Sequence, residues 1–431
     1  MSKSFYIETF GCQMNVHDSE KMSGMLKMEG YHETNDPGNA DIIVLNTCSI
    51  REKAEQKFFS RLGRLKLLKR KRSDLKIAVA GCIAQQQGGK IFQRSPYVDL
   101  VVGPQNIHLL AELGRNGLRT TACHENPQIA DFDYVADRKD RVKALVTIMY
   151  GCNNYCSYCV VPYTRGREQS RPKEKILVEI RALASKGFKE VTLLGQNVNS
   201  YRGEVEFPEL LRQINEIEGL ERIRFVTSHP KDLSDDLIAA IRDLDKVCEH
   251  IHLPLQSGSS EILRMMNRRY TYEDYMQKIS HLRREIPSIA ITTDIIAGFP
   301  QEKEADHAMT LRALREVAFD GIFAFNYSPR PGTAAAKFTG QVEEETKSRR
   351  LAEIIDLQNL ITDEKQKIME NSIQEVLIDS ATDDRQQILS GRTRTNKIVN
   401  IPGTSPVPIS DIVSVRIVKA NRHSLIGSLI L

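Results

Sequence analysis

Short apolar runs recur along the chain between longer polar segments of helical character, and this alternation constrains the fold more than any other feature. In the first third of the chain the runs are residues 5–9, 41–46, 75–80 and 98–102. Strands that alternate with helices form βαβ units, whose strands lie parallel in one sheet. The first third therefore predicts an α/β domain built on a parallel sheet.

A second series of apolar runs follows a polar stretch without periodicity and has six members. These runs are residues 145–149, 190–194, 223–227, 250–253, 289–296 and 322–327. Six βα units with right-handed crossovers predict an open, partial (β/α)6 barrel, because a complete eight-unit barrel typically needs about 250 residues.

The rest of the chain has two further patterns. Residues 342–371 are charged and helical, and from residue 372 short strand-like runs predict a small antiparallel β-barrel. A length of 431 residues favours about three domains. The predicted division is residues 1–123, a linker at 124–142, a central domain at 143–370 and the C-terminal barrel at 371–431.

Composition excludes several classes of protein. No apolar run approaches the roughly 20 residues that span a bilayer, and the N-terminus lacks the layout of a secretory signal. We therefore expect a cytoplasmic protein without a membrane partner. The net charge of +4 is compatible with a polyanionic partner but does not require one. Eight cysteines are too few for a disulfide scaffold, so clustered cysteines indicate metal binding or catalysis.

Cys152, Cys156 and Cys159 form a C-x3-C-x2-C motif directly after the first run of the central series. Three thiolates on one loop can hold three irons of a cubane cluster and leave the fourth iron open to a substrate. A structural zinc site would need a fourth ligand, and none follows at the spacing of a zinc finger. The motif favours an iron-sulfur cluster over zinc.

Cys12, Cys48 and Cys82 are too far apart in the sequence for a local metal motif, but each follows the carboxyl end of a predicted strand. Parallel strands end along one edge of a sheet, so the three thiols could converge there. Gly11 and Gly81 precede two of them and permit a tight turn. The alternative is three separate core cysteines, which is also our interpretation of Cys123 and Cys248.

Several longer motifs surround these cysteines. They include TFGCQMNVHDSE, NTCSIREKAEQK, GCNNYCSYCVVPYTRGREQSRP, LLGQNVNSY, VTSHP, HLPLQSGS and YSPRPGTAAA. The CxxxCxxC segment resembles the radical S-adenosylmethionine (SAM) superfamily. Together with the N-terminal cysteines and the C-terminal barrel, which resembles a TRAM domain, the chain resembles the methylthiotransferases over essentially its whole length. Gln13, Met14 and Asn15, together with the NTCSIREKAEQK segment, resemble the branch that acts on isopentenylated tRNA rather than the branches that act on a ribosomal protein or on threonylcarbamoyladenosine.

The resemblance implies an enzyme with two 4Fe-4S clusters. Cys152, Cys156 and Cys159 would hold the cluster that binds SAM and cleaves it with one electron to a radical. Cys12, Cys48 and Cys82 would hold an auxiliary cluster that supplies sulfur, and a second SAM in each turnover would supply the methyl group. A methylthio group would be inserted at carbon 2 of N6-isopentenyladenosine at position 37 of tRNA. The alternative substrates are a threonylcarbamoyladenosine tRNA or a ribosomal-protein aspartate.

The resemblance also implies cofactor-binding roles for other residues, and some of these residues have an alternative structural role. The candidate cofactor-binding residues are Gly195, Gln196, Asn197, Gln256, Ser257, Asp294 and Arg165. A glycine at a strand end is also an ordinary turn residue, and Asp294 could instead cap the next helix. Arg165 offers a bidentate fork to a cofactor carboxylate or a tRNA phosphate, or it forms a salt bridge.

Basic residues cluster in the C-terminal barrel, where Arg392, Arg394 and Lys397 are candidate RNA-binding residues that would track phosphate. We also expect an electron donor of the flavodoxin or ferredoxin type and a monomeric state. Two other functions remain open from the residues alone. An electron carrier would keep complete four-thiolate sets, and an RNA-binding structural protein would use the cysteines for zinc.

Overall fold

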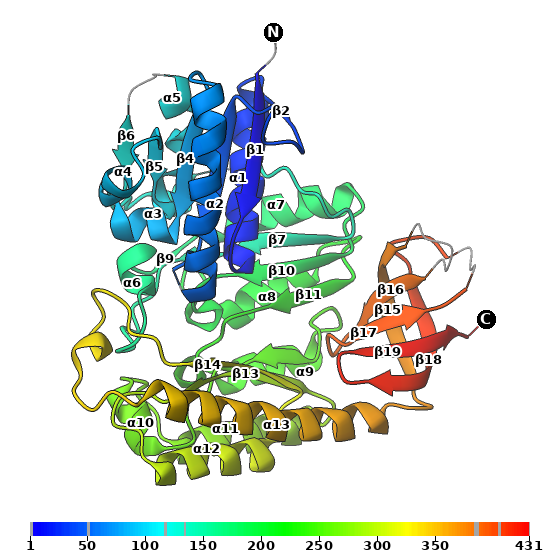
Figure 1. The fold of residues 1–431 in the computed structure, drawn as a ribbon. Coiled ribbons are helices and arrows are strands. Elements are labelled where there is room, and N and C mark those ends of the chain that lie inside the picture. The colour runs from blue at the N-terminus through cyan, green and yellow to red at the C-terminus, as the bar shows by residue number, and fades with distance from the viewer. Residues whose placement is uncertain are drawn as a thin grey trace.

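The computed structural model describes residues 3–49, 52–115, 119–132, 135–382, 388–403 and 407–430. Figure 1 shows an N-terminal α/β domain in blue, a central domain in green, and a C-terminal barrel in orange and red. The long helix α13 (Glu344–Ile368) runs along the central domain and ends beside the barrel. This helix confirms the helical segment predicted from residue 342.

The N-terminal domain contains one six-stranded sheet of parallel strands in the order β2-β1-β3-β4-β5-β6. Its strands are β1 (Ser4–Thr9), β2 (His32–Glu33), β3 (Ile42–Thr47), β4 (Lys76–Gly81), β5 (Leu100–Val102) and β6 (Thr120–Ala122). The four predicted strands are β1, β3, β4 and β5, so the parallel α/β fold is confirmed. The two edge strands are short and were not predicted.

Helices cover both faces of this sheet. Side chains from α2 (Glu52–Lys71), such as Phe58 and Leu62, pack with Ile43 of β3 on one face. Side chains from α1 (Gln13–Met28), such as Met22, pack with the adjacent Val44 on the other face. Alternate residues of a strand point to opposite faces, so a strand covered on both sides is a continuous apolar run.

The central domain contains the six predicted parallel strands in two sheets of three, ordered β11-β10-β7 and β12-β13-β14. The strands are β7 (Lys143–Thr147), β10 (Glu190–Leu194), β11 (Arg222–Phe225), β12 (His250–His252), β13 (Ala290–Ala297) and β14 (Gly321–Asn326). One isolated parallel bridge, Ile223 to Val247, joins the two halves. The partial barrel is therefore confirmed, and its ladder is interrupted between β11 and β12.

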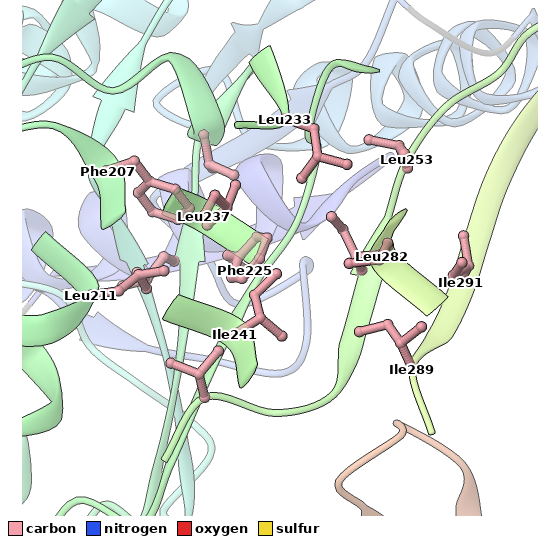
Figure 2. Close-up of a cluster of buried hydrophobic side chains, with 14 of the residues drawn as sticks. Phe207, Leu211, Phe225, Leu233, Leu237, Ile241, Leu253, Leu282, Ile289 and Ile291 are labelled. Atoms are coloured by element: carbon pink, nitrogen blue, oxygen red, sulfur yellow. The ribbon is translucent and has the colours of Figure 1, made fainter. Parts of the chain in front are cut away.

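Apolar side chains at helical spacing hold this barrel together. Helix α8 (Phe207–Asn215) buries Phe207, Leu210, Leu211 and Ile214, which lie on one face of the helix. Figure 2 shows part of this core, where α8, β11, α9 (Asp235–Asp243) and α11 (Tyr272–Glu285) meet β13.

The C-terminal barrel is closed by five strands in the order β15-β16-β17-β19-β18. They are β15 (Ile373–Ala381), β16 (Leu389–Thr393), β17 (Ile398–Ile401), β18 (Ile412–Asn421) and β19 (Ser424–Leu429). Four pairs are antiparallel, whereas β17 and β19 are parallel. Strand directions cannot alternate around a closed ring of five, so one parallel pair is required. The predicted barrel is confirmed with this refinement.

The turn between β16 and β17 docks on the amino ends of the central strands. Arg224 donates hydrogen bonds to the carbonyl oxygens of Thr393 and Arg394, at 2.7 and 2.8 Å. Arg394 in turn pairs with Glu249, which precedes β12, at 2.8 Å. The C-terminal barrel thus covers the amino-terminal end of the central barrel. It leaves uncovered the carboxyl ends of the strands, which is where barrel active sites form.

Replacing Arg394 with glutamine should weaken this docking. Glu249 would lose a two-nitrogen contact with the guanidinium, and hydrogen bonds to charged groups contribute about 1.5–3 kcal/mol each. We expect hydrogen exchange of residues 393–397 to accelerate about tenfold or more. The matched control is Arg422→Gln, because Arg422 also joins the barrel to α13 through Asp363 but is exposed, so its loss should have little effect. Equal protection of residues 393–397 from hydrogen exchange in the two variants would contradict this role of Arg394.

Candidate functional site

Cys12, Cys48 and Cys82, the N-terminal triplet, lie at the carboxyl ends of three neighbouring strands. Cys12 precedes α1, Cys48 directly follows β3, and Cys82 begins α3 (Cys82–Gln87) directly after β4. The thiols of Cys12 and Cys48 interact directly, and the charge of Cys12 acts on Cys82. The three residues therefore share one edge of the sheet, and a joint metal site stays a prediction.

The backbone at Gly11 allows this close approach. Gly11 has φ +120°, and a Cβ atom at this position would lie 3.0 Å from Cys48 Sγ and 2.3 Å from Cys48 Cβ. A larger residue would displace the second thiol of the triplet, and the left-handed conformation also favours glycine. Glycine is thus required here by the neighbouring cysteine.

Arg165 extends from the central domain into the N-terminal triplet. Its Nη1 lies 2.8 Å from Asp18 Oδ2, and its Nη2 donates to Asn15 Oδ1 at 3.2 Å; both partners are on α1. The pKa of the Cys12 thiol is lowered to about 6, mainly by the hydrogen bond with Cys48 and also by the positive Arg165, whereas burial opposes both effects. Burial raises the pKa of the Cys82 thiol. The site therefore favours one thiolate beside a fixed cation.

Arg165 was predicted to bind a cofactor carboxylate or a tRNA phosphate. The structure instead gives its guanidinium a carboxylate partner within the protein and buries it to 5% exposure. The salt-bridge alternative is the one observed, although the pair is buried and not on the surface.

Cys152, Cys156 and Cys159, the central triplet, lie on a loop closed at its base by the antiparallel pair β8 (Met149–Tyr150) and β9 (Gln169–Ser170). The Cys152 amide donates to the Gly166 carbonyl at 3.2 Å, and the Cys159 amide to the Cys156 carbonyl at 2.9 Å. Burial, followed by the negative charge of Cys156, raises the pKa of the Cys159 thiol to about 12. The three thiols therefore lie close enough to influence one another in a poorly solvated loop.

The two triplets lie on either side of the contact between the domains. Arg165 follows Cys159 by six positions, so the chain between them spans at most about 20 Å. The short helix α6 (Val161–Thr164) occupies this segment and packs against α3. One segment of chain thus connects the central triplet to the N-terminal one.

The cofactor candidates at the end of β10 contact the central loop. Gln196 Oε1 accepts a hydrogen bond from the Gly151 amide at 2.5 Å, beside Cys152. Gly195 packs on Met149, and a Cβ atom there would lie 2.5 Å from Met149 Cγ. Asn197 donates to Asp232 at 2.7 Å. Residue 195 is glycine because Met149 packs closely against it, and not because the chain simply turns there.

The remaining cofactor candidates lie on the other half of the barrel. Gln256 has φ +73° and exchanges backbone hydrogen bonds with Asp294 and Ile296, so it extends the ladder beyond β12. Ser257 is fully buried and its hydroxyl accepts from the Ser259 amide. Asp294 lies within β13, with Oδ2 3.5 Å from His252 Nε2, and α12 (Glu304–Val317) begins after Lys303. Asp294 therefore does not cap that helix.

Buried polar atoms without a hydrogen-bond partner gather beyond the carboxyl ends of the central strands. Among the described residues, such atoms near these strand ends include Thr147 Oγ1, Gln196 Nε2, Asn197 Oδ1, Ser228 Oγ, His229 Nε2, Asn326 Oδ1 and Tyr327 OH, and others lie elsewhere in the molecule. Buried polar groups are normally paired with protein or water, so a group of these atoms at one end of the barrel leaves hydrogen bonds for water or a polar ligand. This donor and acceptor set fits SAM, which offers amino, carboxylate, hydroxyl and adenine groups. Ser228 and His229 were not assigned to the site from sequence, although they lie in the VTSHP motif.

The donor chemistry of the triplets fits iron-sulfur clusters. Thiolate ligands hold such clusters, and a three-thiolate set leaves one iron available. In the described parts of the chain, no three His, Cys, Asp or Glu side chains are arranged to hold a single metal ion.

The predicted RNA-binding residues contact the protein itself. Arg394 pairs with Glu249, and Lys397 Nζ lies 3.2 Å from Asp320 Oδ1. Arg392 donates to Asn396 within the same turn. Arg394 and Lys397 thus dock the barrel on the central domain, whereas Arg392 bonds within the barrel, and a contact with tRNA stays a prediction for these three residues.

Family models match all three parts of the chain. The radical SAM superfamily model matches residues 146–314, the TRAM domain model matches residues 367–430, and a model described as uncharacterized protein family UPF0004 matches residues 4–103. In the part of the chain that the model describes, no helix is long and apolar enough to cross a membrane.

Curated relatives match over the full length. The chain is 55% identical to tRNA-2-methylthio-N(6)-dimethylallyladenosine synthase of Thermodesulfovibrio yellowstonii, over 99% of both chains. It is 50% identical to the protein of the same name from Clostridium botulinum, over 98% of this chain and 96% of that protein.

Solved structures show a similar fold at low identity. The radical SAM methyltransferase TsrM of Kitasatospora setae, with a SAM analog bound, matches with a TM-score of 0.60 and 14% identity, over 78% of this chain and 75% of that one. At this identity the likeness concerns the fold alone, and it agrees with the partial barrel.

Proposed function

The chain belongs to the family of tRNA-2-methylthio-N(6)-dimethylallyladenosine synthases, and from this membership we propose that its two cysteine triplets act together on one tRNA adenosine. The reaction is radical-SAM methylthiolation of N6-isopentenyladenosine in tRNA, at carbon 2 of the base at position 37. The position of Arg165 supports this cooperation. Arg165 follows the central triplet in the sequence, and its side chain contacts the N-terminal triplet and Asp18.

Cys152, Cys156 and Cys159 would hold a 4Fe-4S cluster with one open iron for SAM. When bound, the cluster and SAM supply the one-electron chemistry that removes hydrogen from an adenine carbon too unreactive for a side-chain base. The chain's own residues position these groups. Gln196 fixes the base of the cysteine loop through the Gly151 amide, and the unpaired atoms at the strand ends offer hydrogen bonds to SAM.

Cys12, Cys48 and Cys82 would hold the auxiliary cluster that supplies sulfur, with a second SAM in each turnover as the methyl donor. Arg165 and Asp18 would orient this site and join it to the central domain. The target base would leave its stack to reach the radical. Modification of a threonylcarbamoyladenosine tRNA or a ribosomal-protein aspartate is not favoured by the relatives.

The remaining proposals concern partners and location. The TRAM domain and the tRNA-modifying relatives support a tRNA substrate. We propose an electron donor of the flavodoxin or ferredoxin type, a monomeric enzyme and a cytoplasmic location, as the sequence predicts.

The experiment is anaerobic reconstitution of the full chain with iron and sulfide, followed by SAM, a reductant and isopentenylated tRNA. Mass spectrometry of the digested nucleosides should show one added methylthio group on the isopentenylated adenosine. Cleavage of SAM without that product would keep the radical assignment and overturn the substrate. A reconstituted protein that does not cleave SAM would overturn the assignment of the central triplet.

A further inference from the structure

Arg268 is a buried arginine without a carboxylate partner among the described residues. Its side chain is 4% exposed. The five other arginines with comparable burial each pair with a carboxylate within 3 Å. These pairs are Arg165–Asp18, Arg171–Glu179, Arg222–Glu375, Arg224–Glu190 and Arg350–Glu302. Arg268 is therefore an exception that needs a different negative partner, because an uncompensated buried charge is costly.

The partner that the structure offers is a cysteine of the central triplet. Arg268 Nη1 donates to Cys156 Sγ at 3.4 Å and approaches the Tyr158 hydroxyl at 3.5 Å. Its other nitrogens are fixed by neutral oxygens, with Nη2 2.8 Å from the Pro254 carbonyl and Nε 3.0 Å from the Tyr270 hydroxyl. Nη1 faces Cys156, and its oxygen acceptor, the Tyr158 hydroxyl, lies at the longer distance of 3.5 Å.

The segment that carries Arg268 also holds the backbone of the cysteine loop. Following α10 (Ser260–Met265), the Met266 carbonyl accepts from the Ser157 amide at 3.0 Å. Asn267 Nδ2 donates to the Tyr155 carbonyl at 3.0 Å. Asn267 and Arg269 both have positive φ, which turns neighbouring side chains in different directions. The guanidinium is thus delivered to Cys156 by a segment already bound to the same loop.

We propose that Arg268 balances the charge of the iron-sulfur cluster held by the central triplet and makes the reduced cluster easier to form. This inference rests on the proposed function, because it requires a cluster at Cys152, Cys156 and Cys159. A cluster held by three thiolates is negatively charged, and the single electron taken from an added reductant increases that charge without breaking a bond. A fixed cation and a hydrogen bond to a cluster sulfur both stabilise the reduced form and raise its potential. Arg268 is thus a positioning residue that acts through Cys156.

The test compares Arg268→Gln with Arg269→Gln in the full reconstituted chain. The adjacent Arg269 is exposed, so the control removes the same formal charge at a solvated position. An electron paramagnetic resonance titration with dithionite would follow the cluster whose signal changes when SAM is added. At a fixed potential, the reduced-to-oxidised ratio should fall at least tenfold in Arg268→Gln, a shift of about 59 mV, and less than threefold in Arg269→Gln. Equal potentials in the two variants would overturn the proposal.

A second variant covers the case in which Arg268→Gln does not retain its cluster. Arg268→Lys keeps the charge but cannot bind Pro254 and Cys156 with one planar fork. At the same fixed potential, its reduced-to-oxidised ratio should fall less than tenfold from that of the parent protein. A fall of tenfold or more despite the retained charge would overturn the proposal. Neither readout requires tRNA, so absence of the methylthio product would count against the proposed function and not against this role.

Discussion

Replacing Cys156 with alanine is expected to reduce cleavage of SAM at least about a hundredfold. Residues that only support metal ligands already cost 10–100-fold when changed, so loss of a ligand should cost more. Cys156 lies between the other two thiols of its loop in the sequence and accepts the hydrogen bond from Arg268. The variant should therefore lose both a ligand and the partner of a buried charge. The measurement is 5′-deoxyadenosine formed in the presence of a reductant, with the iron content of the same sample.

The iron content should fall by about half, because the N-terminal triplet is unchanged. Cys248→Ala is the matched control, since Cys248 is also buried and its surroundings are Arg224 and Glu190 rather than either triplet. This control should retain both iron and cleavage. Normal formation of 5′-deoxyadenosine by Cys156→Ala would refute the assignment of the radical cluster to this loop.

The convergence of the N-terminal triplet could be predicted from the sequence because it follows from parallel topology. Strands β1, β3 and β4 are neighbours in the sheet, and each is followed within three residues by its cysteine. Parallel strands end at one edge, so residues more than 30 positions apart are brought together without any information on side-chain contacts. The fold class and the N-terminal triplet were accessible for this reason, whereas the central triplet was recognised from its local C-x3-C-x2-C spacing.

The roles of individual arginines could not be predicted in the same way. Arg394 is paired with Glu249, 145 positions earlier, and no local pattern marks that carboxylate as its partner. Arg268 and Arg269 are identical neighbours in the sequence, yet only the first is buried. Their separation depends on a turn with positive φ at Asn267, which becomes visible only in the structure. Basic clusters in a sequence therefore indicate charge but not its partner.

The backbone before α12 contains a non-glycine residue in a left-handed conformation. Gln301 adopts φ +67°. A left-handed conformation costs a non-glycine residue roughly 1–2 kcal/mol, so glycine is the more favourable residue there. The Gln301 amide donates to the Gly340 carbonyl at 2.7 Å, which holds this conformation in place. This left-handed residue lies just before α12 and outside both cysteine triplets.

Replacing Cys48 with alanine is expected to separate the two halves of the reaction. Cys48 follows β3, the middle strand of the three that carry the N-terminal triplet, and it is the hydrogen-bond partner of the Cys12 thiol. Its loss would leave two thiols, which cannot hold the auxiliary cluster in the proposed three-thiolate form. The central triplet is unchanged, so 5′-deoxyadenosine should still form. The methylthio product should fall to background in mass spectra of the digested tRNA.

The control for this variant is Cys123→Ala, in the same domain. The Cys123 thiol donates to the Ala84 carbonyl at 3.3 Å and packs on the sheet without joining the triplet, so the control should keep the product. A normal amount of methylthio product from Cys48→Ala would disprove the auxiliary site. Loss of both SAM cleavage and the product would instead mean that the N-terminal triplet is needed to hold the central loop. Arg165 provides a physical link for this effect, because it binds Asp18 and contacts Cys82. Product loss with retained cleavage is the result that assigns sulfur supply to Cys12, Cys48 and Cys82.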